Sequence, residues 1–122
     1  MAALFFVISL FLQAAPSQIA GVWHGNSVCT VADSPCRDEV NVYRFSEIAG
    51  KPGWFSATAS KIVDGKEVVM GSTEWKYTAE ARTMESHISG ATIKLIVDGN
   101  KMEGTLILQD NTVYRRIHLK KE

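Results

Sequence analysis

Two cysteines, Cys29 and Cys36, are the residues of this chain whose type and spacing most directly suggest covalent or metal chemistry. A zinc site would need two further ligands at finger-like spacing, and the neighbouring sequence lacks them. A catalytic thiol would have to escape pairing with the other cysteine in an oxidising compartment. An even cysteine count in an exported chain predicts a disulfide, which for so short a loop stabilises the fold by roughly 2 to 3 kcal/mol. We therefore expect a structural Cys29–Cys36 bond in preference to a metal pair or a nucleophile.

Three histidines, His24, His87 and His118, could bind a metal or a haem. Alternate side chains of a strand face opposite sides of the sheet. If Ile117 and Leu119 face inward, then His118 faces solvent, and His24 and His87 also alternate with neighbours expected to face inward. We predict three exposed histidines. A chance metal site between His24 and His118 on the outer surface is the alternative.

Sequence motifs of catalysis are missing from the chain. It contains no Gly-x-Ser-x-Gly, no His-Glu-x-x-His and no phosphate-binding loop, and no pair of acids can be placed across a cleft. The acidic residues Asp33, Asp38 and Glu39 lack the regular spacing and the glycine of an EF-hand loop. The sequence predicts a protein that is not an enzyme and that needs no metal or other cofactor.

The first residues resemble a secretory leader. Leu4 to Leu12 form one apolar run, and Gln13-Ala14-Ala15-Pro16 follows as a small-residue cleavage region. The run is shorter than the roughly 20 residues that span a bilayer. We expect a signal peptide over residues 1–14, a single mature domain over residues 15–122 without a membrane span, and a secreted or periplasmic location. A buried N-terminal strand and an uncleaved anchor are the alternatives.

Charge is balanced, with 13 basic and 13 acidic residues. The basic residues are scattered, so the chain lacks the positive stripe that nucleic-acid binding requires. Nucleic acid is therefore not an expected partner.

Eight segments rich in Val, Ile, Thr and aromatic residues alternate with turn signals such as Asp64-Gly65 and Asp98-Gly99. Such a meander removes its two open edges by closing on itself. The sequence predicts an all-β fold, an eight-stranded antiparallel up-and-down barrel. The expected strands are 21–30, 39–48, 54–64, 67–77, 82–88, 92–98, 101–109 and 112–120.

The opening Gly21-Val22-Trp23-His24-Gly25 is similar to the first strand of lipocalin-like (calycin) barrels, a group that includes small secreted bacterial proteins. In that family an Arg near the end of the barrel commonly covers the Trp of the first strand. The resemblance implies a structural pair between Trp23 and Arg115, since alternation in the last strand turns Arg115 inward. The mature length is nearer to avidin-like barrels and to secreted metalloprotease inhibitors. The opening also resembles nitrobindin-type haem barrels, in which the proximal His is late in the chain, as His118 is here.

Two functions of different class follow from this reading. The first is binding of a small apolar or amphipathic ligand inside the barrel, with Tyr43, Thr73, Ser86 and Arg115 as polar contacts. Trp54, adjacent to Phe55 at a loop edge, is a further candidate for the barrel mouth or a partner surface, because one of the two must face outward. The second is a filled barrel that binds a secreted protein through loops 33–37 and 51–55, as an enzyme inhibitor would. The size of the internal cavity separates the two.

Overall fold

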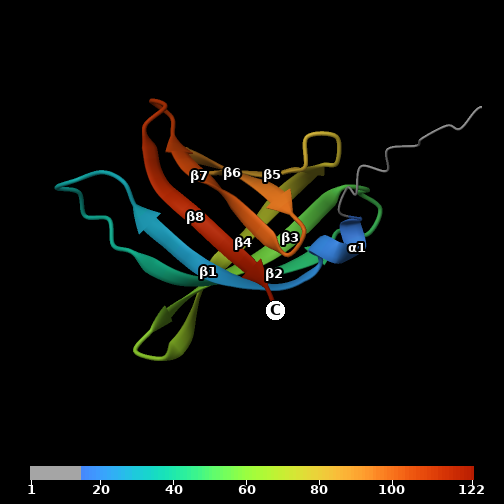
Figure 1. Ribbon diagram of the computed structural model, residues 1–122, viewed down its shortest axis with the longest axis horizontal. Coiled ribbons are helices and arrows are strands. Elements are labelled where there is room, and N and C mark those ends of the chain that lie inside the picture. The colour runs from blue at the N-terminus through green and yellow to red at the C-terminus, as the bar shows by residue number, and fades with distance from the viewer. Residues whose placement is uncertain (1–14) are drawn as a thin grey trace, which may run out of the picture.

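The computed structural model describes residues 15–122 and confirms the closed, eight-stranded antiparallel barrel (Figure 1). The strands follow one another around the barrel, and β8 pairs with β1 to close it. Their bounds are β1 (Gly21–Cys29), β2 (Glu39–Glu47), β3 (Trp54–Val63), β4 (Lys66–Thr78), β5 (Thr83–Ile88), β6 (Ala91–Asp98), β7 (Lys101–Leu108) and β8 (Val113–Lys121). Each end lies within one residue of the sequence expectation. The expected signal peptide, residues 1–14, lies outside the described residues.

The turn between β3 and β4 shows why these segments fold as hairpins. Asp64 and Gly65 have φ values of 51° and 76°. Two consecutive positive φ values are the geometry of a two-residue turn whose twist matches that of the flanking strands, and Asp-Gly tolerates it at low cost. This turn sets the register in which Val63 pairs with Lys66.

The barrel wall is uneven around its circumference. β3 and β4 share ten residue pairs, whereas β4 and β5 share three, those that join Lys76–Thr78 to Thr83–Glu85. The long β3–β4 hairpin extends away from the rest of the barrel (Figure 1). Val68, Val69 and Met70 on this hairpin are exposed. The pairing of β4 with β5 is therefore the shortest in the barrel wall.

A single helical turn, α1 (Pro16–Ile19), covers one end of the barrel, which we call the Trp23 end. Ile19 and Trp23 are both fully buried, and the Trp23 indole N–H donates to the Ile19 carbonyl at 2.8 Å. Lys121 lies opposite Trp23 on β8, and its ammonium donates to the carbonyl of Gln18. Within residues 15–122, no helix has the length and apolar character needed to cross a membrane.

The expected pair between Trp23 and Arg115 is wrong. In the β1–β8 ladder Trp23 faces Lys121, whereas Arg115 faces Cys29, six positions further along β1. Six residues of strand span about 20 Å. The basic residue at the Trp23 end is therefore Lys121, and Arg115 belongs to the opposite end.

That opposite end, called here the disulfide end, contains the expected Cys29–Cys36 bond, which the structure confirms. The two Cα atoms are 6.0 Å apart. The bond closes the loop that joins β1 to β2, and the Cys29 backbone N–H donates to the Asp38 carboxylate at 2.8 Å. The loop is thus fastened to β1 by one covalent bond and one hydrogen bond.

Inward-facing side chains fill the Trp23 half of the barrel. The fully buried large residues there include Trp23, Phe55, Trp75, Met84, Leu95, Met102 and Leu119. Trp75 meets the rings of Tyr43 and Phe45 edge-on, with centroids 6.0 and 5.6 Å away. This aromatic cluster of Tyr43, Phe45 and Trp75 marks the depth at which the packed core ends, because Tyr43 also lines the cavity described below.

Candidate functional site

A cavity of about 480 Å³ occupies the disulfide end of the barrel. Its size is within the range of small-molecule sites, about 300 to 1,000 Å³. One part of the wall is polar and consists of Ser27, Glu39, Asn41, Tyr43, Ser72, Thr73, Ser89 and Arg115. Another part is apolar and consists of Ala59, Met70, Ile88, Ile93, Leu106 and Ile117, with Gly71 completing the lining. The site therefore has the mixed character that suits an amphipathic molecule.

Arg115 is held in place at this cavity by several acceptors. It shares the inward face of β8 with Ile117 and Leu119, as alternation predicts, and its side chain is 14% exposed. One guanidinium nitrogen donates to the Ser27 hydroxyl at 3.1 Å and to the Arg37 carbonyl at 3.0 Å. Contact with Arg37 links the barrel interior to the disulfide loop.

The positive charge of Arg115 has a negative partner inside the cavity. Its other guanidinium nitrogen lies 3.6 Å from the Glu39 carboxylate, whose side chain is 22% exposed. A partly buried pair of this kind is screened less than a surface pair. The two charges balance, so the polar wall carries hydrogen-bonding groups without a net charge.

Tyr43 extends from β2 to the floor of the cavity and is 6% exposed. The pKa of its hydroxyl is raised to about 12, chiefly by burial and in smaller part by Glu39, while Arg115 opposes the shift. The phenol therefore remains protonated at physiological pH and can donate a hydrogen bond into the cavity.

Asn41 also lines the cavity and is 1% exposed. Its amide nitrogen lies 3.2 Å from a Glu39 carboxylate oxygen and 3.4 Å from the Ser60 carbonyl. Both neighbours are acceptors, so they fix the orientation of the amide. The amide oxygen Oδ1 is buried and has no hydrogen-bond donor among the described residues.

The remaining predicted ligand contacts, Thr73, Ser86 and Trp54, lie in three different places. Thr73 lines the cavity, and its hydroxyl accepts a hydrogen bond from the Trp75 indole at 2.8 Å. Ser86 is buried but lies outside the cavity lining, where its hydroxyl donates to the Glu74 carbonyl at 2.7 Å. This side-chain bond bridges β5 to β4 just beyond their short ladder. Ser86 is thus placed as a link in the wall.

Trp54 lies on the outer surface, while its neighbour Phe55 is fully buried, as the alternation requires. The Lys51 ammonium is 4.4 Å from the centre of the Trp54 ring, and the Lys76 ammonium is 5.9 Å away. Trp54 therefore lies outside the disulfide-end cavity, and its use as a surface for a partner stays a prediction.

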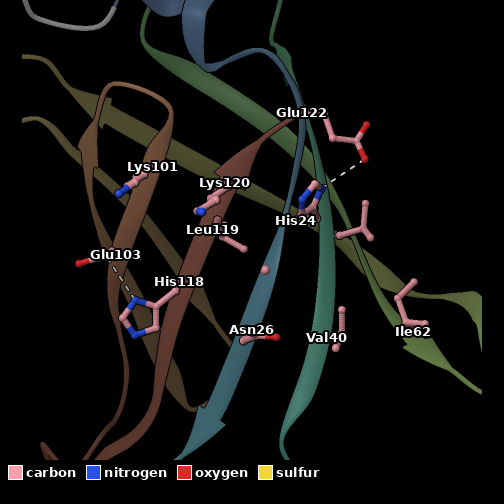
Figure 2. Close-up of a pocket in the computed structure, with 12 residues that line it drawn as sticks. His24, Asn26, Val40, Ile62, Lys101, Glu103, His118, Leu119, Lys120 and Glu122 are labelled. Atoms are coloured by element: carbon pink, nitrogen blue, oxygen red, sulfur yellow. Dashed lines mark hydrogen bonds and ion pairs between the residues drawn. The ribbon is translucent and has the colours of Figure 1, made fainter.

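A second hollow lies on the outside of the barrel, across β1, β2 and β8, where Gly25 lets the strands approach closely. Figure 2 shows His24 turned toward Glu122 and His118 turned toward Glu103. The corresponding distances are 3.3 and 3.4 Å. His24 faces Lys120 across the ladder, and His118 faces Asn26, so the two imidazoles are not direct neighbours. Residues 15–122 contain no group of three or more His, Cys, Asp or Glu side chains placed to hold a metal.

The sequence reasoning missed Asn41, Glu39 and Ser27 as members of the polar wall. A signal for them exists, because Glu39, Asn41 and Tyr43 alternate along β2 and must share the inward face once Tyr43 is placed inside. Ser27 could be placed in the same way, because it lies four residues after Trp23 on β1 and therefore shares its inward face.

Comparison with known proteins adds no relative to this description. No protein-family model and no curated protein sequence matches the chain.

Proposed function

We propose that this protein is a non-catalytic binding barrel of the lipocalin-like (calycin) type, and that it holds a small amphipathic ligand at the disulfide end. The observation that carries the proposal is the cavity of about 480 Å³ in a barrel whose other half is packed. Close packing is the default of protein interiors, so a hollow of this size favours occupation by a ligand.

The proposal includes a secreted or periplasmic location. The Cys29–Cys36 disulfide supports it, because such bonds persist mainly in oxidising compartments. It is also compatible with the leader-like composition of residues 1–14.

Native mass spectrometry of the protein purified from a secretory compartment tests the proposal. We expect an added mass that disappears on mild denaturation. The matched variants are Ala59→Leu, which fills part of the cavity, and Val40→Leu, which adds a methylene in the outer hollow. Ala59→Leu should lose the added mass and Val40→Leu should keep it. Retention of the mass in a folded Ala59→Leu protein would place the ligand elsewhere.

An interaction protein, such as an inhibitor of a secreted enzyme, is the second candidate. Exposed Val68, Val69 and Met70 on the projecting β3–β4 hairpin favour it, because apolar side chains exposed on a projecting element offer a surface to which a protein can bind. A wild-type spectrum without any added mass would move the preference to this candidate.

A further inference from the structure

The buried Asn41 amide oxygen has no hydrogen-bond donor among the described residues. A buried acceptor without a partner is destabilising by about 1 to 3 kcal/mol, and buried polar atoms of native proteins are nearly always paired. Rotating the amide does not solve this, because the oxygen would then face the carboxylate of Glu39 and the carbonyl of Ser60. Asn41 lines the cavity, but its Oδ1 has almost no surface open to it, so a donor that enters the cavity reaches this oxygen only when the neighbouring lining side chains shift slightly.

The charges of the cavity restrict its ligand further. Arg115 already has Glu39 as its ionic partner, and both side chains are largely buried. An anionic ligand would have to share Arg115 with Glu39, and a cationic ligand would have to share Glu39 with Arg115. Either would leave one of these two largely buried charges poorly compensated, which is unfavourable. A ligand without net charge avoids both costs.

The apolar part of the wall provides the remaining contact. Ile88 and Ile93 come from the β5–β6 side, Met70 from β4, and Leu106 and Ile117 from β7 and β8. These aliphatic side chains form a surface against which an apolar part of the ligand can pack. Burial of that part contributes about 25 cal/mol per Å² of apolar area.

We propose that the ligand is an electrically neutral molecule whose hydroxyl or amide N–H donates to Asn41 Oδ1 while an aliphatic body lies against Ile88, Ile93 and their apolar neighbours. This inference rests on the proposed function and specifies its ligand class.

Two isomers of the same formula provide the test, nonan-1-ol and octyl methyl ether. Both have an oxygen and an aliphatic chain, but only the alcohol has a donor. We expect isothermal titration calorimetry on the full chain to give an affinity about ten-fold higher for the alcohol. Because the ether is the more apolar isomer, transfer from water alone would favour the ether, so this order depends on the hydrogen bond. Nonanoate should bind more weakly than nonan-1-ol.

Two variants test whether Asn41 is the residue that accepts the hydrogen bond from the ligand. Asn41→Ala removes the orphan acceptor and should erase the preference for the alcohol, whereas Ser72→Ala removes a different hydroxyl of the wall and should retain it. If Asn41→Ala does not fold, the comparison of the alcohol with the ether on the wild-type protein still tests the proposed ligand class.

Equal affinities, or tighter binding of the ether, would show that water already serves Asn41 and would overturn the ligand class while leaving the binding barrel supported. If nonanoate bound most tightly of the three, the proposal that the ligand is electrically neutral would be overturned. Absence of binding by all three compounds would overturn the proposed binding function and the ligand class together.

Discussion

Raising the pH should destabilise the barrel through Tyr43, because the folded protein resists ionisation of this phenol. Burial at the cavity floor, with Glu39 adding to it, raises the pKa of Tyr43 from 10.0 to about 12. In the unfolded chain the phenol ionises near pH 10. The folded state therefore keeps its proton over a range in which the unfolded state loses it. The contribution to stability is complete below pH 10 and is lost as the pH rises toward 12.

The size of the effect follows from the two pKa values. A shift of one unit corresponds to 1.36 kcal/mol, so the full loss is about 3 kcal/mol. At pH 11 the unfolded phenol is about nine-tenths ionised and the folded one about one-tenth, which gives a loss of about 1 kcal/mol. That is a sizeable share of a typical folding free energy of about 5 to 15 kcal/mol.

Guanidinium chloride unfolding at pH 9 and pH 11 measures this loss, with Tyr43→Phe as the matched control. The variant removes only the hydroxyl, and every other titrating group is present in both proteins. We expect wild type to lose about 1 kcal/mol more than Tyr43→Phe between the two pH values. Parallel losses would mean that Tyr43 ionises as a solvated phenol does, and would refute the description of the cavity floor as desolvated.

Three further perturbations test the packing that supports the site. Gly25→Ala should prevent normal folding, judged by loss of the cooperative thermal transition, because its Cβ would lie 1.7 Å from a backbone oxygen of β8; a stable variant would contradict this strand spacing. Trp23→Phe should lower the free energy of unfolding by at least about 1 kcal/mol, since the hydrogen bond to Ile19 is lost, and an unchanged denaturation midpoint would contradict its role in closing that end. Replacing Cys29 and Cys36 together by Ser should cost about 2.5 kcal/mol in chemical denaturation while the far-ultraviolet spectrum stays that of a β-barrel, and an unaltered stability would show that the loop is ordered without its bond.

Local signals in the sequence predicted most of the fold. Asp64 and Gly65 define their turn because few residue pairs accept two positive φ values. Alternation placed Ile117 and Leu119 inside, and both are 1% exposed. Each of these inferences depends on residues close in the chain, where turn geometry and strand pleat leave little freedom.

The position of Arg115 could not be derived in this way. No turn connects β1 to β8, so the register between them comes from barrel closure, which sums the stagger of all eight strands. An irregularity after Leu106 shifts the β7–β8 register as well. Inward orientation of Arg115 was therefore predictable, whereas its height along the barrel, and with it the partner Glu39 in place of Trp23, was not.

The three-pair ladder between β4 and β5 has a kinetic consequence. Local opening of a protein costs least where few backbone hydrogen bonds and few buried contacts must be broken. The cavity is bounded by Met70 and Thr73 on β4 and by Ile88 at the end of β5, so separation of these two strands exposes its contents. Those amides of 83–85 that bond β4 and not β6 should therefore exchange with solvent faster than those of the ten-pair β3–β4 ladder. Opening of this seam would then add a route by which a bound molecule leaves the cavity, while the Trp23 end stays folded and the disulfide loop stays in place.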